Sequence, residues 1–133
     1  MASQTRMSGE FDRVLDDRFR VVVPAPWRRT LMEMAEENPV LMCSPALSGG
    51  ALELRTTEQF NRWVSQLAKH EPTGRLSGVQ LSMLSHCKQV EVDSRGSITL
   101  PDVLVRLVNL HREVTWKGND DAMVLCNRRR RQN

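Results

Sequence analysis

The decapeptide LDDRFRVVVP, residues 15–24, returns in altered form as VDSRGSITLP, residues 92–101. Both copies hold an aspartate, an arginine two positions later, a mainly apolar triplet and a closing proline, in the same order and 77 residues apart. In a chain of 133 residues this internal repeat predicts two related halves. Because a unit of ~60 residues buries too little surface to be more than marginally stable alone, we expect the halves to share a core.

The two aspartates of the repeat are predicted to form turns. An Asp at the first turn position accepts hydrogen bonds from amides two or three residues later, which suits Asp16 and Asp93. Gly96 permits a positive φ where the chain re-enters a strand. The first copy has Phe19 there, where a left-handed conformation would cost roughly 1–2 kcal/mol. We therefore expect either another turn geometry or a neighbouring surface that holds Phe19.

Strands and helices are predicted in the same order in both halves. The first half begins with a β-hairpin, followed by a helix in APWRRTLMEMAEEN and by a strand, VLMCS, that pairs with GGALELR. The hairpin arms are residues 11–15 and 21–23. In the second half, a hairpin over 89–100 precedes a helix over 102–109 and two alternating runs in EVTWKGNDDAMVLC. These elements predict an α+β fold, with domains at residues 1–75 and 76–133.

Two further helices are predicted between the halves. Thr56 and Gln59 have the spacing of a capping box, in which the Thr hydroxyl faces the Gln amide. Apolar residues then follow at helical spacing in two stripes. The first stripe consists of Phe60, Trp63, Val64 and Leu67, and the second of Leu76, Val79, Met83, Leu84 and Cys87. We interpret both stripes as core or subunit interface, and expect part of the first at a subunit boundary.

The positive charge is concentrated at the C-terminus. Of the 19 basic residues, Arg128 to Arg131 contribute four, and without them the net charge of +3 becomes −1. A basic tail commonly attracts nucleic acid without sequence preference. The alternative interpretation is a solvated terminus that favours solubility.

Several other classes of protein are disfavoured by the sequence. No run of 18 apolar residues is present and the N-terminus lacks the apolar segment of a signal peptide, so a cytoplasmic protein is expected. The three cysteines, Cys43, Cys87 and Cys126, lack metal-ligand spacing and are interpreted as reduced thiols. No catalytic motif surrounds the histidines, and no Gly-rich phosphate loop occurs. We therefore expect no enzyme, no cofactor, no metal and no small-molecule substrate.

The repeat and the order of elements resemble the MraZ family of transcriptional regulators of bacterial division and cell-wall gene clusters. GEFDRVLDDRFRVVVPAPWRR and VDSRGSITLPDVLVRLVNLHREVTWKGNDDAMVL carry the resemblance, and the helix with Trp63 fits the family layout. The family signature is D-x-x-G-R, followed by alternating apolar residues and Pro. The first copy keeps the arginine as Arg20 and lacks the glycine, whereas the second keeps Gly96 and has Ser97 in place of arginine.

The resemblance implies an AbrB-type swapped-hairpin fold with pseudo-two-fold symmetry and a homo-oligomeric ring that binds successive repeats of double-stranded DNA. It also implies a nucleoid-associated location. Arg20 occupies the motif position, while Arg18 and Arg95 occupy variable positions where the family often has a basic residue. Arginine contacts phosphates and reads guanine edges. Arg18, Arg20 and Arg95 are therefore the predicted DNA-binding residues.

Two alternatives compete with this interpretation. Arg18, Arg20 and Arg95, with Asp17, are also compatible with solvated turn residues that form ion pairs worth less than ~1 kcal/mol, although their placement in both copies of the turn favours the DNA interpretation. The altered signatures also fit an assembly or interaction protein that keeps the fold and has lost specific DNA binding. Salt-dependent binding to duplex DNA distinguishes these possibilities.

Overall fold

Two matched series of elements are joined by a helical arm. The computed structural model describes residues 7–34, 38–46, 49–119 and 121–129. The described part of the first half contains β1 (Gly9–Val14), β2 (Arg20–Val22), α1 (Ala25–Met34), β3 (Val40–Pro45) and β4 (Ala51–Thr56). The arm contains α2 (Thr57–Lys69) and α3 (Gly78–Leu84), and the second half contains β5 (Lys88–Glu91), β6 (Ser97–Thr99), α4 (Asp102–Leu107), β7 (Glu113–Gly118) and β8 (Met123–Asn127). This mixture of antiparallel strands and helices confirms the α+β prediction.

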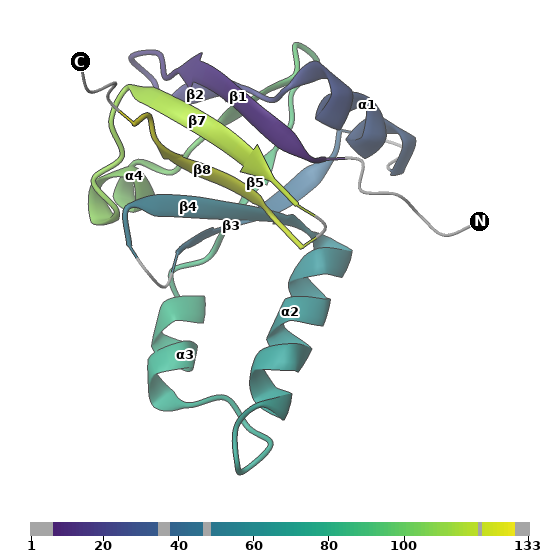
Figure 1. Ribbon diagram of the computed structural model, residues 1–133, viewed down its shortest axis with the longest axis vertical. Coiled ribbons are helices and arrows are strands. Elements are labelled where there is room, and N and C mark those ends of the chain that lie inside the picture. Colours follow the sequence, from purple (N-terminus) through teal and green to yellow (C-terminus); the bar gives the residue numbers. More distant parts are fainter. Residues whose placement is uncertain (1–6, 35–37, 47–48, 120, 130–133) are drawn as a thin grey trace.

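The strand order is symmetric between the halves. Six strands form an antiparallel sheet in the order β1-β7-β8-β4-β3-β5 (Figure 1), and β2 pairs with β6 in a separate ribbon. The equivalent strands are β1 and β5, β3 and β7, and β4 and β8. Exchanging the two members of each pair gives the same strand order in reverse. The duplication in the sequence therefore corresponds to a duplication of the fold.

The hairpin predicted at the start of each half is wrong in its strand pairing. The arms of each expected hairpin do not pair with one another: β1 pairs with β7, β5 pairs with β3, and β2 pairs with β6. Each half thus supplies its first strand to the third strand of the other half. The hairpin β3–β4, turning through Gly49 and Gly50, and the pair β7–β8 agree with prediction. Alternation of apolar and polar residues predicts a strand but does not show whether its partner is near or distant in the sequence.

Aromatic side chains occupy the core beneath the ribbon. Trp27 of α1 and Trp116 of β7 are fully buried, with ring centroids 5.6 Å apart in an edge-to-face arrangement. Phe11 packs edge-on against Trp27 at 5.4 Å. Each buried indole needs a hydrogen-bond acceptor: Trp27 donates to the Ser8 carbonyl and Trp116 to the Val22 carbonyl, both at 3.0 Å. The second bond attaches β2 directly to the core.

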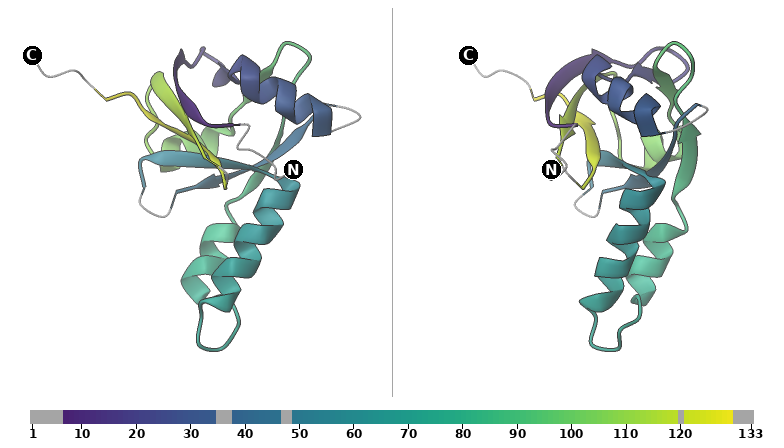
Figure 2. Two further views of the ribbon diagram at one scale, coloured as in Figure 1. Left: turned by 45° about the vertical axis from the view of Figure 1, so that its right-hand side comes forward. Right: turned by 90° about the vertical axis from the view of Figure 1, so that its right-hand side faces the viewer.

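The helical arm projects from the end of the molecule opposite α1 and the ribbon (Figures 1 and 2). The predicted capping box is confirmed: the Gln59 amide donates to the Thr56 hydroxyl at 3.1 Å, and the Gln59 side chain accepts from the Thr56 amide at 2.9 Å. At the base of α2, the buried Arg55 forms a 2.8 Å ion pair with Glu53 and lies 3.8 Å from the Trp63 ring centre. The first apolar stripe thus faces a charged group as well as the sheet.

Candidate nucleic-acid interface

The two signature turns have the same hydrogen-bond pattern. One carboxylate oxygen of Asp16 accepts the amides of Arg18 and Arg20 at 2.8 and 2.9 Å. One oxygen of Asp93 accepts the amides of Arg95 and Ser97, both at 2.9 Å. The amide two residues on was predicted, while the second donor lies four residues on. Both aspartates therefore organise their turns from within.

The same backbone conformation is adopted by two very different residues. Phe19 has φ +61° and Gly96 has φ +82°. The expectation of another geometry for the first turn is therefore wrong, whereas the alternative of a supporting surface holds, because Phe19 packs against the core. The Phe19 carbonyl accepts the Leu100 amide and the Gly96 carbonyl accepts the Val23 amide, both at 2.9 Å. Each turn thus closes onto the strand of the other half.

Between the turns, β2 and β6 form an antiparallel ribbon with a clear inner and outer face. Val21 pairs with Ile98, its own equivalent in the repeat, and both are buried. The pseudo-two-fold axis therefore passes between them. The outer face carries Arg20, Val22, Ser97 and Thr99, of which Ser97 alone is half-buried. Since the turns precede antiparallel strands, they lie at opposite ends of the ribbon.

The structure places the three predicted DNA-binding arginines around this ribbon. Arg18 and Arg95 are exposed in the two turns, and within the described ranges neither guanidinium has a carboxylate partner. Arg20 is exposed at the start of β2 and its Nε donates to Asp16 at 2.7 Å. The ribbon thus has cationic groups at both ends, two of them unpaired and one shared with a carboxylate.

The contacts of Asp16 stabilise its charged form. The amide of Arg20, then its side chain and the amide of Arg18, donate to the carboxylate, and these bonds hold the pKa of Asp16 below its ordinary value of 3.8. The carboxylate is therefore ionised at neutral pH and keeps Arg20 in place. It also restrains the guanidinium beside the turn instead of leaving it free in solvent.

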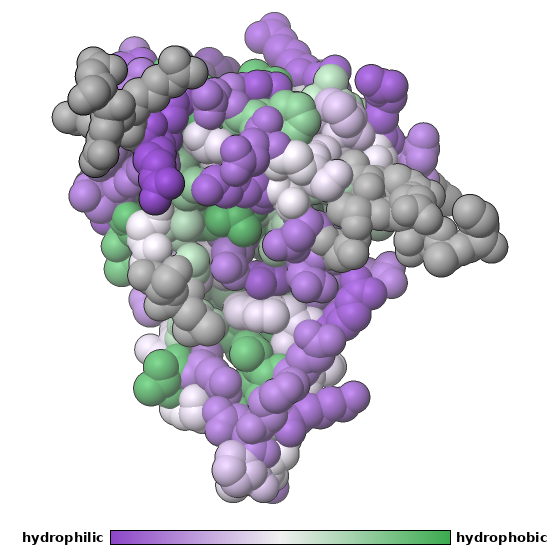
Figure 3. Space-filling view, viewed as in Figure 1, coloured by the Kyte–Doolittle hydropathy of each residue, from purple (hydrophilic) through white to green (hydrophobic). Residues whose placement is uncertain are grey.

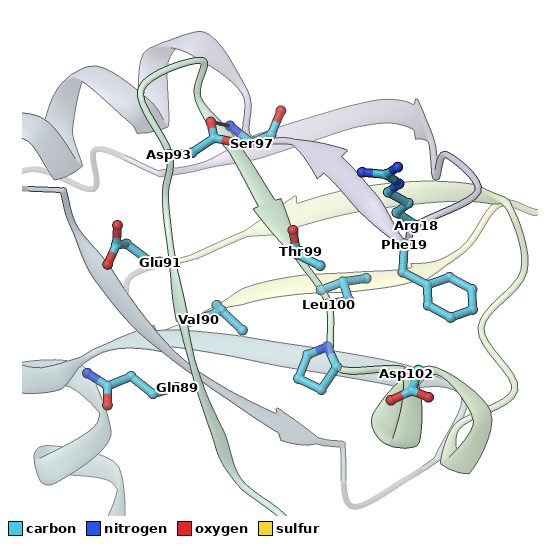
Figure 4. Close-up of a pocket in the computed structure, with 11 residues that line it drawn as sticks. Arg18, Phe19, Gln89, Val90, Glu91, Asp93, Ser97, Thr99, Leu100 and Asp102 are labelled. Carbon is cyan, nitrogen blue, oxygen red and sulfur yellow. Dashed lines mark hydrogen bonds between the residues drawn. The ribbon is translucent and has the colours of Figure 1, made fainter.

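An open cavity of about 560 Å³ lies beside the ribbon (Figure 4). Figure 4 shows Arg18 and Phe19 at one end of β6, with Asp93 and Ser97 at the other. The carboxylate of Asp93 is engaged by turn amides. Among its lining residues the structure shows no hydrogen bond between a hydroxyl and a carboxylate, and the cavity provides a concave flank to the ribbon.

The basic segment predicted at residues 128–131 does not begin as a solvated terminus. Arg128 belongs to the folded body: its Nη2 donates to the Arg13 carbonyl at 2.7 Å, and its guanidinium lies 3.6 Å from Asp12 and 3.8 Å from Glu113. Arg129 is exposed, while Arg130 and Arg131 lie outside the described residues. Because Arg128 joins β1, β7 and the end of β8, we expect removal of residues 128–133 to affect the fold.

The remaining reactive side chains can be compared with the ligand sets of metal centres only where the structure describes them. Within the described ranges, no group of three His, Cys, Asp or Glu residues is arranged to hold a metal ion. Burial raises the pKa of Cys43 to about 12, so this thiol stays protonated at neutral pH. In the same ranges, every helix is too short or too polar to cross a bilayer.

Sequence reasoning missed Arg28. This residue lies in α1, outside the signature, and its Nη1 donates to the Arg95 carbonyl at 3.0 Å. Helical periodicity gave no signal for it, since Arg28 is one of two consecutive arginines in an amphipathic helix. Only the tertiary placement of α1 shows that Arg28 contacts the second turn.

Comparison with known proteins identifies relatives that span most of the chain. A transcriptional regulator MraZ of Mesoplasma florum is 28% identical over 116 residues, which cover 86% of this chain and 75% of the relative. A protein of the same name from Proteus mirabilis is 29% identical, covering 78% and 68% of the two chains. A third, from Anaeromyxobacter, is 25% identical and covers 83% and 75%. No protein-family model matches the chain.

Proposed function

Because this chain belongs to the MraZ family, we propose that it is a DNA-binding transcriptional regulator whose β2–β6 ribbon contacts duplex DNA. The observation that carries the proposal is the outward ribbon face with arginines at both ends. A two-stranded ribbon fits the major groove of B-DNA. The Trp116 bond to the Val22 carbonyl fixes the ribbon before DNA arrives, which limits the ordering cost of binding.

The three arginines have different roles in this proposal. Arg18 and Arg95 are exposed and unpaired within the described residues, which suits phosphate contacts. Arg20 is held by Asp16 at the base of the ribbon, and a guanidinium in a fixed orientation suits bidentate recognition of guanine. Phosphate contacts position the protein, whereas a base contact supplies sequence preference.

The proposal includes a ring of identical subunits. The arm exposes apolar residues, with Val79 75% and Leu81 56% exposed on α3, and Figure 3 shows hydrophobic surface over this part of the molecule. Such surface marks interfaces more often than free solvent contact. A ring would present several ribbons, so one bound subunit raises the effective DNA concentration for the next. Native mass measurement at micromolar concentration tests this, and a monomer alone contradicts it.

The finer parts of the proposal concern fold and biological role. We interpret the exchange of first strands between halves as the swapped-hairpin arrangement, with residues 1–75 and 76–133 as the exchanging units. We propose that the protein acts in the cytoplasm at the nucleoid, on a division or cell-wall gene cluster. Mapping its binding positions on its own genome tests this role, and sites scattered without relation to such genes contradict it.

Binding titrations at several salt concentrations test the DNA interface. We expect Arg20→Ala to weaken binding more than Arg95→Ala, because the motif arginine is present only in the first copy. Removal of one phosphate contact lowers the slope of log K against log salt by roughly 0.9, whereas removal of a base contact reduces discrimination by ~1–3 kcal/mol. Arg62→Ala, on the exposed side of α2, is the matched control. A duplex selected from a random pool by the wild-type protein is the probe.

The second candidate function is an assembly protein without specific DNA binding. The altered signatures and the exposed residues of α3 favour it. It is supported if Arg18→Ala, Arg20→Ala and Arg95→Ala leave affinity and salt slope unchanged while the oligomer stays intact. A drop in either quantity with any of the three eliminates it.

A further inference from the structure

The second signature turn is covered by a side chain from α1. Arg28 crosses Gly96, and a Cβ atom placed on Gly96 would overlap the guanidinium and Cδ of Arg28. Its Nη1 donates to the Arg95 carbonyl at 3.0 Å. The glycine at this position therefore provides the space through which Arg28 reaches the turn, in addition to the positive φ.

The first turn has the opposite arrangement. There the guanidinium comes from the strand, since Arg20 bends back to Asp16. The residue of α4 that corresponds to Arg28 in the repeat is Val105, which is buried. Each turn therefore has one guanidinium held against it. In the first turn it belongs to Arg20 of the motif, and in the second turn it belongs to Arg28 of α1, in the other half.

The charge of Arg28 is also less compensated than that of Arg20. Across the described ranges, no carboxylate lies within ion-pair distance of Arg28, whereas Arg20 pairs with Asp16 at 2.7 Å. The bond from Arg28 to the turn is made to a neutral carbonyl through one of its nitrogens. A guanidinium has five N–H donors, so donors remain for an anion while the carbonyl fixes its position.

We infer that Arg28 is a further phosphate-contacting cation of the second turn, beside Arg95, in the copy where the motif has Ser97 instead of arginine. The inference rests on the proposed function and adds a residue outside the signature to the interface. It also relates the two altered motifs. The second copy lacks the arginine and keeps Gly96, which leaves room for Arg28. The first copy keeps Arg20 and has Phe19 at the glycine position. The ribbon is then cationic at both ends.

Arg28→Ala, compared with Arg29→Ala, tests this assignment. Arg29 is the adjacent exposed residue of α1 and makes no ion pair with any described residue, so both variants remove the same charge from the same helix. On the selected duplex we expect Arg28→Ala to weaken binding by about tenfold or more and to lower the salt slope by roughly 0.9 for each phosphate that it no longer neutralises. Arg29→Ala should leave both quantities close to wild type.

A second variant separates a phosphate contact from a structural role. Adding Ser97→Arg to Arg28→Ala restores a motif cation without restoring the bond to the Arg95 carbonyl, and we expect it to recover most of the affinity and slope of the wild type. Circular dichroism and thermal unfolding confirm that each variant is folded.

Three results overturn the inference. If Arg28→Ala behaves like Arg29→Ala while Arg20→Ala weakens binding, Arg28 is not a contact and the proposed function stands. If Arg28→Ala weakens binding without a change in slope and Ser97→Arg gives no recovery, Arg28 only supports the turn. If the wild-type protein shows no salt-dependent binding to any duplex, both the inference and the proposed function fail.

Discussion

At the scale of single residues, Phe19 combines an unfavourable backbone conformation with favourable packing. Its φ of +61° lies in the left-handed region, which costs an L-residue roughly 1–2 kcal/mol. Its ring is partly buried against the core, so it gains part of the about 1.5–3 kcal/mol that full burial of a Phe side chain contributes. This packing offsets the strain at least in part, so the position tolerates a residue that turn statistics disfavour.

Substitution of Phe19 distinguishes the two effects. Phe19→Ala loses the ring and keeps the strain, whereas Phe19→Gly loses the ring and relieves the strain. We expect the glycine variant to be more stable than the alanine variant by about 1 kcal/mol, measured by urea unfolding. Val22 is 46% exposed in an extended strand, so Val22→Ala should be more stable than Val22→Gly. The same order at both positions would contradict the assignment of strain to Phe19.

Asp16 gives a pH dependence of known sign. The amide of Arg20, with the other turn donors, lowers the pKa of Asp16 below 3.8. A carboxylate with a lower pKa in the folded state adds stability that is complete above its unfolded pKa and is lost as the pH falls through its folded pKa. We therefore expect the turn to persist down to the ordinary value of 3.8 and to weaken only below it.

Carboxyl chemical shifts followed by NMR measure the Asp16 titration directly. In Arg20→Ala the backbone amide at that position still donates, so the pKa should rise only part of the way to its ordinary value. A wild-type midpoint at the ordinary value would show that the turn bonds are absent in solution.

At the scale of secondary-structure elements, local signals predicted helices well and strand partners poorly. The capping box at Thr56 and Gln59 is a contact between residues that are close in the sequence, so the local sequence is sufficient to predict it. The pairing of β1 with β7 joins Gly9 to Gly118, and alternation in either strand says nothing about which partner it takes. The same limit applies to the candidate interface: the motif led to the prediction of Arg18, Arg20 and Arg95, whereas Arg28 reaches the turn only through the packing of α1.

The end of β8 provides a test at this scale. Arg128 bonds to the Arg13 carbonyl and lies near Asp12 and Glu113, so deletion of residues 128–133 removes a link between strands as well as positive charge. We expect this deletion to lower the melting temperature by several degrees, consistent with a loss of about 1 kcal/mol. Deletion of residues 130–133 alone should leave it unchanged. Equal melting temperatures for both deletions would show that the Arg128 contacts contribute nothing.

At the scale of the whole molecule, the exchange of strands makes the two halves interdependent. Residues 1–75 lack the partners of β1 and β2, and residues 76–133 lack those of β5 and β6. Unpaired strands leave backbone groups and apolar faces exposed. We expect each fragment alone to be unfolded or aggregated by circular dichroism and size-exclusion chromatography, and the two to form a folded complex when co-expressed. A soluble, folded fragment by itself would contradict this.

The pairing of β1 with β7 also determines when the protein can fold during synthesis. While the first 87 residues are being made, the helices and the β3–β4 hairpin can form, but β1, β2 and the outer side of β3 have no partner. The ribbon closes only after β6 has left the ribosome, and the sheet only after β8 has, because β8 joins β7 to β4. Long-range pairing of this kind slows folding and leaves the early strands exposed to other nascent chains. The strand pairing that joins the two halves in the finished protein therefore prevents the nascent chain from completing its fold until its last quarter has been synthesised.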